Sequence, residues 1–216
     1  MSASTRNRPL RRQVYDTVRE DLRQGRIGKE TLLVERELAS ELGVSRTPVR
    51  EALYALEQDG FVQSTARGFK PRRLNDMEIT HVFEMRQLLE PHALASVVDA
   101  EAAALERDLV KALDAQRRAH EEDDAEAFMA GNEQYRSAWL DRLTNPRLAS
   151  AIALYDDHIH ALRLSTLHDG DTRRVAIQSL QAVVEAVASG KRDRVISRYK
   201  AHLRAAEKAL RVSQAE

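Results

Sequence analysis

Apolar residues in the first third of the chain recur at helical spacing, and glycines close each apolar run. Val14, Val18 and Leu22 lie four residues apart, which predicts a helix over 11–24 that stops at Gly25. The same reasoning predicts two further helices with their terminating glycines: 35–42 with Gly43, and 45–59 with Gly60.

Short extended segments accompany these helices. One, at 31–34, precedes the second helix, and two β-rich segments, 61–64 and 69–72, flank Ala66-Arg67-Gly68. The flanked triplet predicts a hairpin, because glycine tolerates the positive φ that tight hairpin loops need. Helix, strand, helix, short turn, helix and hairpin is the order of a winged helix-turn-helix.

The third predicted helix carries the candidate DNA-reading residues. In a helix-turn-helix the N-terminal residues of this helix lie nearest the base edges of the major groove. Arg46 and Arg50 are four residues apart and lie off the apolar side, so both guanidinium groups can point outward. Such groups make bidentate contacts with guanine and phosphate. The alternative, ordinary solvated arginines, is disfavoured because the arginine pair, a helix cap at Ser45 and the wing glycine occur together.

From Met77 onward the sequence is rich in Ala, Leu, Val and Glu and has few helix breakers, which predicts an all-α segment. We therefore expect a mainly α protein: a winged helix-turn-helix with a small β-hairpin wing in residues 1–75, then an all-α helical bundle in residues 76–216. The expected helices of the bundle are 76–100, 105–120, 124–143, 146–164, 172–189 and 192–212.

Charge and composition support this division and exclude other classes. The 216 residues have no net charge, yet the first 75 carry a surplus of five positive charges, as a nucleic-acid module would. The chain has no cysteine, which excludes disulfides, a thiolate nucleophile and cysteine-ligated zinc. No apolar run reaches ~20 residues and no signal peptide is visible, so we expect a cytoplasmic protein without a membrane partner.

Two motifs in the first third carry a family resemblance. Glu35-Arg36-Glu37-Leu38-Ala39 and Ser45-Arg46-Thr47-Pro48-Val49-Arg50-Glu51-Ala52-Leu53 resemble the DNA-binding domain of the GntR family of bacterial transcription regulators, over about residues 11–74. The resemblance implies DNA contacts from Arg36, Arg46, Thr47, Arg50 and Gly68. To these we add Ser45 at the start of the third helix and Arg67 in the hairpin.

The helical remainder resembles the all-α ligand-binding domain of the FadR subfamily. The resemblance rests on residues 77–91 and on Asn145-Pro146-Arg147-Leu148, which fits an Asn-Pro-x-Leu signature. An all-α bundle senses a ligand through polar groups on inward faces, so polar residues that interrupt apolar stripes are the candidates. Arg86, Asn132 and His202 lie in such stripes and Arg136 borders one; Tyr135, itself a member of that stripe, completes the ligand candidates.

Three of the candidates have a second interpretation. Glu90 lies one helical turn after Arg86, so an internal ion pair is weighed equally with a ligand role for that arginine. Arg136 could instead reach solvent, and His202 could be a buried structural residue. His158 and His160 lie two residues apart on one predicted helix, face different ways and are expected at its surface or border.

Many members of the subfamily bind a divalent metal through an Asp, a His four residues later and two further His. When this sequence is matched to that ligand pattern, Asn132, Arg136 and Leu180 stand at the first three ligand positions. Only the fourth position, His202, keeps a metal-binding side chain. An amide, a cation, an aliphatic chain and one imidazole do not form a site for Zn²⁺, Mn²⁺ or Ni²⁺. We therefore expect no metal and no cofactor, with Arg136 supplying a fixed positive charge.

The sequence thus predicts a homodimeric transcription regulator that binds double-stranded operator DNA, with a repressor favoured over an activator. A small anionic metabolite in the helical domain is expected to control its operator affinity; the choice between repression and activation stays open. One alternative is an architectural DNA-binding protein without an effector. Another is an all-α enzyme using Asp156, Asp157, His158 and His160, disfavoured because no activated nucleophile, phosphate loop or metal triad is present.

Overall fold

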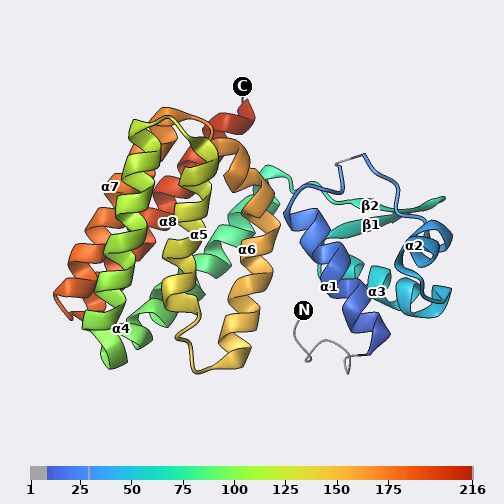
Figure 1. Ribbon diagram of the computed structural model, residues 1–216, viewed down its shortest axis with the longest axis horizontal. Coiled ribbons are helices and arrows are strands. Elements are labelled where there is room, and N and C mark those ends of the chain that lie inside the picture. The colour runs from blue at the N-terminus through green and yellow to red at the C-terminus, as the bar shows by residue number, and fades with distance from the viewer. Residues whose placement is uncertain (1–8, 29, 216) are drawn as a thin grey trace. The chain divides into compact units, whose positions relative to one another are not determined.

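The computed structural model describes residues 9–28 and 30–215, with side chains described except at 161, 162, 164, 165 and 213–215 (Figure 1). Within this range the fold is mainly helical, which confirms the expected class. The chain divides into two compact units, Met1–Asn75 and Asp76–Glu216.

The first unit is a winged helix-turn-helix. Its elements are α1 (Leu10–Arg23), α2 (Glu35–Leu42), α3 (Arg46–Gln58), β1 (Val62–Thr65) and β2 (Gly68–Pro71). Helices α1 and α3 pack against each other, and the apolar face that α3 buries is Val49, Ala52, Leu53 and Leu56. The opposite face of α3 is thereby left for contacts outside the unit.

A tight left-handed turn joins α2 to α3. Gly43 has φ 65° at the C-terminus of α2, and the N–H of Val44 donates to the Ala39 carbonyl at 3.0 Å. Glycine suits this position because it has no Cβ to clash in the left-handed region. Ser45 takes the N-cap position of α3, but its hydroxyl makes no capping hydrogen bond, so the expected side-chain cap is wrong.

The wing is a two-stranded antiparallel hairpin in which Thr65 pairs with Gly68 across the loop residues Ala66 and Arg67. Gly68 has φ 149°, and a Cβ there would lie 2.5 Å from the backbone oxygen of Leu33. This close approach lets Leu33 exchange two backbone hydrogen bonds with Phe69, at 2.7 and 2.9 Å. The expected extended segment at 31–34 is thus reduced to a single β-bridge at Leu33.

The second unit is helical throughout, as expected. It contains α4 (Asp76–Glu121), α5 (Ala125–Leu140), α6 (Pro146–Thr166), α7 (Gly170–Ala188) and α8 (Arg192–Ala215). Helices α4, α5, α7 and α8 supply nearly all of its main apolar core, which includes the fully buried Trp139. Of the described α6 side chains, Ile152 is the one that is buried in this core and Leu148 packs against it.

Helix α4 differs from the expectation of two helices, 76–100 and 105–120. It is one continuous run with a kink at Glu101, where φ is −141° and ψ is 33°. One non-helical residue bends the axis, and Ala102–Ala104 lets the helix resume at once. None of the described helices is long and apolar enough to cross a membrane.

Candidate DNA-reading surface and effector cavity

The start of α3 presents the candidate DNA-reading residues to the outside of the unit. The side chains of Arg46 and Arg50 are 61% and 54% exposed, and Thr47 is exposed beside them. Because α3 buries its opposite face, these groups can reach a bound duplex without disturbing the core. Arg36, Ser45 and Arg67 are exposed as well.

Glu35 draws the two α3 arginines together. Arg46 Nη2 lies 3.3 Å from its Oε2, and Arg50 Nε lies 3.1 Å from the same oxygen. The carboxylate at the start of α2 therefore orients both guanidinium groups. Sequence reasoning missed Glu35, although it opens the same motif that supplied Arg36.

The structure gives Gly68 a clear architectural role. Its half-buried backbone makes room for the bridge between Leu33 and Phe69, so the wing depends on glycine at this position. Direct contact of Gly68 and of the other six candidates with DNA stays a prediction.

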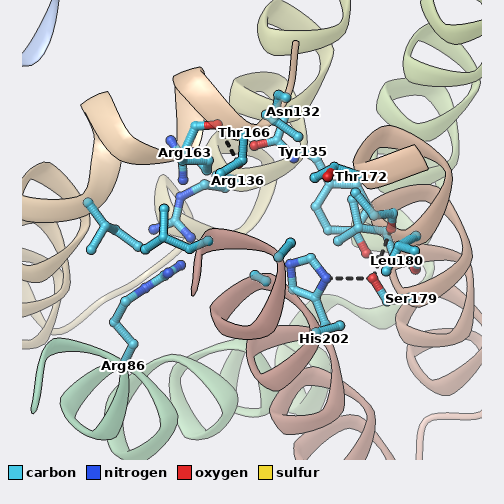
Figure 2. Close-up of a pocket in the computed structure, with 18 of the residues that line it drawn as sticks. Arg86, Asn132, Tyr135, Arg136, Arg163, Thr166, Thr172, Ser179, Leu180 and His202 are labelled. Atoms are coloured by element: carbon cyan, nitrogen blue, oxygen red, sulfur yellow. Dashed lines mark hydrogen bonds between the residues drawn. The ribbon is translucent and has the colours of Figure 1, made fainter. Parts of the chain in front are cut away.

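The second unit contains a cavity, and all five ligand candidates lie on its wall (Figure 2). Arg86 comes from α4, Asn132, Tyr135 and Arg136 from α5, and His202 from α8. The volume open to the centres of water molecules is about 70 Å³. Sequence reasoning missed further polar wall residues: Arg163, Thr166, Thr172 and Ser179.

The cavity wall has two chemical regions. Figure 2 shows Arg86, Arg136 and Arg163 on one side and His202, Ser179 and Leu180 on the other. Small or aliphatic side chains of α7 and α8 complete the wall: Val175, Ala176, Ala205, Ala206, Ala209 and Leu210. The cavity thus combines a cationic side with a largely apolar lining.

Arg86 fulfils the ion-pair interpretation while also lining the cavity. Its Nε lies 2.5 Å from Glu90 Oε1, and both side chains are almost wholly buried, at 5% and 0% exposure. Glu90 also accepts hydrogen bonds from Arg136 Nη1 at 3.1 Å and from the Tyr199 hydroxyl at 2.8 Å. Glu90 is therefore the shared counter-ion of two cavity arginines.

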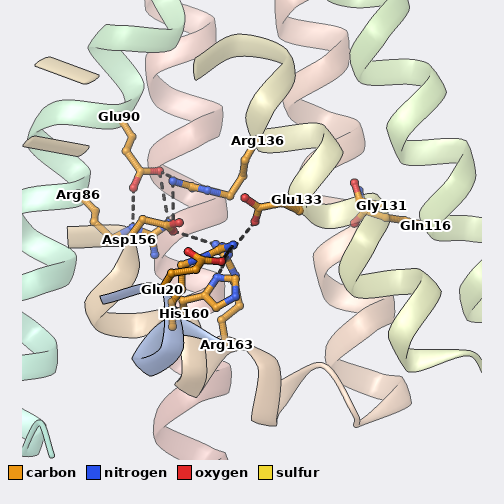
Figure 3. Close-up of polar contacts among 11 residues, drawn as sticks. Glu20, Arg86, Glu90, Gln116, Gly131, Glu133, Arg136, Asp156, His160 and Arg163 are labelled. Atoms are coloured by element: carbon orange, nitrogen blue, oxygen red, sulfur yellow. Dashed lines mark hydrogen bonds and ion pairs between the residues drawn. The ribbon is translucent and has the colours of Figure 1, made fainter. Parts of the chain in front are cut away.

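A second carboxylate, Asp156 of α6, serves Arg136 and Arg163. Its Oδ1 lies 3.2 Å from Arg136 Nη2 and 2.9 Å from Arg163 Nη1 (Figure 3). Arg163 Nη2 also contacts Glu133 Oε2 at 3.4 Å and His160 Nδ1 at 2.9 Å. His160 is buried, at 8% exposure, so the expectation of a surface or border residue is wrong. Spacing within α6 fixes the face that His160 occupies but could not reveal what packs against that face.

The electrostatics of this cluster favour an additional negative charge. Burial acts to raise the pKa of Glu90 and of Asp156, but the adjacent arginines outweigh it and hold both pKa values below their usual range. Burial, with Arg136 and Arg86, lowers the pKa of Arg163 despite the attraction of Asp156. Three guanidinium groups thus share two buried carboxylates, and the third carboxylate in reach, Glu133, is 44% exposed.

His202 is neutral in this setting. Burial, followed by the field of Arg86, lowers its pKa to about 3. The Ser179 hydroxyl donates to the Ala176 carbonyl at 2.9 Å and lies 2.8 Å from His202 Nδ1. Because that hydroxyl proton is already used, Nδ1 carries the ring proton, and Nε2 keeps a lone pair that can accept a hydrogen bond.

The four positions where related domains bind a metal converge on the same cavity, but their residues do not fit a divalent ion. Asn132, Arg136, Leu180 and His202 all lie on its wall. Arg136 is a buried cation paired with Glu90 and Asp156, so it would repel a divalent ion, and Leu180 has no donor atom. Within the described part of the chain, no group of three or more His, Cys, Asp or Glu residues could hold a metal ion. A metal-free protein stays a prediction.

Together, the winged helix-turn-helix and the helical domain with its cavity define a DNA-binding transcription regulator. The family model described as "Bacterial regulatory proteins, gntR family" matches residues 10–68, and the FCD domain model matches residues 81–205, more than half of the chain. The chain therefore belongs to the GntR family, in the FadR subfamily with an FCD C-terminal domain. Its relatives are transcription regulators rather than enzymes.

Curated relatives agree with this membership. The chain is 27% identical over 206 residues to an HTH-type transcriptional regulator in an unstable DNA locus of Streptomyces ambofaciens, covering 94% of this chain and 86% of that protein. It is 32% identical over 104 residues to the gluconate operon transcriptional repressor of Bacillus subtilis, covering 48% of this chain and 43% of the repressor.

Solved structures share the fold. McbR/YncC of E. coli matches with a TM-score of 0.74 and 22% identity, covering 97% of this chain and all of that one. A GntR regulator from Rhodococcus sp. RHA1 matches with a TM-score of 0.71 and 19% identity, covering 94% and 97%. At these identities the likeness concerns the arrangement of the helices and the wing.

Proposed function

We propose that the protein is a homodimeric repressor whose operator affinity is controlled by a small anionic metabolite in the FCD cavity. The observation that carries the anionic class is that three cavity arginines, Arg86, Arg136 and Arg163, share only two buried carboxylates. The third carboxylate in reach, Glu133, is 44% exposed. An anionic ligand would balance the charge of the arginines where little water can do so. Arg136, Asn132 and His202 are the proposed polar contacts, with Arg86 and Tyr135 beside them.

The size of the cavity limits the ligand. About 70 Å³ is well below the roughly 300–1,000 Å³ of typical ligand pockets, so the cavity as it stands suits a ligand of few non-hydrogen atoms. That size suits a short organic acid and excludes a nucleotide-sized molecule unless the helices separate.

Dimerisation and repression rest on separate support. A single short recognition helix reads few base pairs, so a two-fold dimer on half-sites one helical turn apart doubles the contacts. Repression is supported by the similarity to the gluconate operon repressor. The effector would act through different affinities for two arrangements of the paired DNA-binding units.

The test begins with DNA fragments selected by the purified protein from a random pool. Affinity for the best fragment is then measured by fluorescence anisotropy with acetate, lactate or succinate, and with the neutral amide of each acid. We expect at least one acid to weaken DNA binding about 5-fold or more, while its amide has no effect. DNA binding that is indifferent to every acid would favour the architectural alternative, and equal effects of acid and amide would refute the anionic class.

A matched pair of variants localises the response. Arg136→Gln is expected to lose the acid response and also to change acid-free DNA affinity, because it breaks the ion pairs with Glu90 and Asp156. The control, Arg117→Gln, alters an arginine that pairs with Asp114 and Gln181 outside the cavity wall, and should keep both properties. An unaltered acid response in Arg136→Gln would show that Arg136 does not hold the effector.

A further inference from the structure

The guanidinium group of Arg136 is only partly used. Its Nη1 donates to Glu90, whereas its buried Nε and Nη2 atoms have no hydrogen-bond partner. Nη2 lies 3.2 Å from Asp156 Oδ1 and forms an ion pair with it, yet the pair lacks hydrogen-bond geometry. The Nε–Nη2 edge is the side that can grip a carboxylate with two parallel hydrogen bonds.

Helix α6 packs mainly against α4, and this ionic cluster joins it to α5. The Arg136–Asp156 and Glu133–Arg163 ion pairs both join α5 to α6 (Figure 3). Among the described α6 side chains, Ile152 is the one buried in the main apolar core. Weakening the ion pairs would therefore affect α6 more than the helices whose apolar faces build that core.

We propose that Asp156 is a resident counter-ion, which the carboxylate of the effector displaces from Arg136, and that this displacement loosens α6 from α5. The inference rests on the proposed anionic effector. A ligand carboxylate can form two hydrogen bonds with the Nε–Nη2 edge, where Asp156 forms none. Once bound, it also repels the Asp156 carboxylate, which keeps Arg163 as its partner on α6.

Glu90 is unsuited to this role. It is 0% exposed, and Arg86, Arg136 and Tyr199 all donate hydrogen bonds to it. Displacing Glu90 would also leave Arg86 without its ion-pair partner. Separating Asp156 from Arg136 breaks an ion pair but no hydrogen bond, whereas separating Glu90 from Arg136 breaks a hydrogen bond. Asp156 is therefore the carboxylate that is more easily displaced.

Asp156→Asn tests the switch in the full-length protein. The amide keeps the shape of the side chain and removes the charge that holds Arg136. Without acid, this variant should bind the selected DNA within about 3-fold of acid-saturated wild type, and it should bind the effective acid about 10-fold more tightly. Asp114→Asn is the matched control: it makes the same chemical change at a side chain that is 45% exposed, pairs with Arg117 within α4 and lies outside the cavity wall. It should keep acid-free DNA affinity and the acid response of the wild type.

A second measurement does not depend on the folding of a variant. Hydrogen exchange of the wild-type protein is followed with and without acetate, lactate or succinate. On acid binding, amides of residues 146–160 should exchange at least about 3-fold faster, while those of α7 and α8 slow as the cavity fills. Protection of residues 146–160 together with the other helices would overturn the displacement.

The outcomes separate the two hypotheses. If no acid changes the DNA affinity of the wild-type protein, the proposed function fails, and unchanged exchange at residues 146–160 would overturn the displacement with it. If acid changes DNA affinity while Asp156→Asn behaves as wild type and residues 146–160 become protected, the displacement is wrong and the proposed function stands.

Discussion

Glu90 is the most enclosed charge described in the structure, and removing its charge should destabilise the helical unit. Its carboxylate is 0% exposed and is held by Arg86, Arg136 and Tyr199. In Glu90→Gln the side chain keeps its shape, but Arg86 loses its ion-pair partner. Arg136 keeps only Asp156. The variant therefore leaves buried positive charge without compensation, which is costlier than losing an exposed pair.

The expected loss follows from burial. Removing one partner of a buried ion pair costs about 3–5 kcal/mol of unfolding free energy. For a unit of this size, that corresponds to a fall in melting temperature of roughly 6–20 °C. The control Asp99→Asn breaks the exposed pair with Arg192, whose side chains are 45% and 51% exposed. That change should cost less than about 1 kcal/mol.

Urea unfolding followed by tryptophan fluorescence measures this loss directly. Trp139 is the single tryptophan of the chain and is fully buried in the second unit, so its emission reports on that unit. A Glu90→Gln unfolding free energy within about 1 kcal/mol of the wild type would refute the reasoning. It would mean that water or rearranged side chains compensate the arginines.

The difference in unfolding free energy between wild type and Glu90→Gln should decrease as the pH falls. Arg86 and Arg136 outweigh burial and lower the pKa of Glu90 in the folded protein. Its stabilising effect should therefore be complete above the unfolded pKa of about 4.3 and be lost as the pH falls below it. The stability gap between wild type and Glu90→Gln should narrow between pH 7 and pH 3, and a constant gap would contradict the assignment.

Further predictions concern DNA reading, the wing, dimerisation and metal. Arg46→Ala and Arg50→Ala should each weaken binding of the selected DNA by about 1–3 kcal/mol in anisotropy titrations at fixed salt, with unfolding unchanged because both side chains are exposed; unchanged affinity in both would refute the recognition-helix assignment. Gly68→Ala should destabilise the first unit by about 1–3 kcal/mol in denaturation followed by circular dichroism, because its Cβ would lie 2.5 Å from a backbone oxygen. A fragment of residues 76–216 should sediment as a dimer; a monomer would place the dimer interface elsewhere. Elemental analysis of protein purified without chelator should find no stoichiometric transition metal, and a bound ion that chelator removes would contradict this.

The sequence by itself determined the local structure of this protein. Apolar spacing and glycines located the helices of the first unit, since both act over a few residues. Gly43 closes α2 in the left-handed region, as its position after the apolar run predicted. The spacing of Arg46 and Arg50 likewise placed both on one exposed face of α3, because a helix repeats every 3.6 residues.

Tertiary structure alone decided which inward groups meet. The periodicity identified Arg86, Arg136 and His202 as polar residues on apolar faces of three helices, and packing of α4, α5 and α8 brought them to one cavity. Spacing could suggest the Arg86–Glu90 pair because it lies within one helix. It could not show that Asp156 would be shared by arginines of α5 and α6. A side chain's position in a helix fixes the face it occupies, whereas its charge partner depends on which other face packs against it.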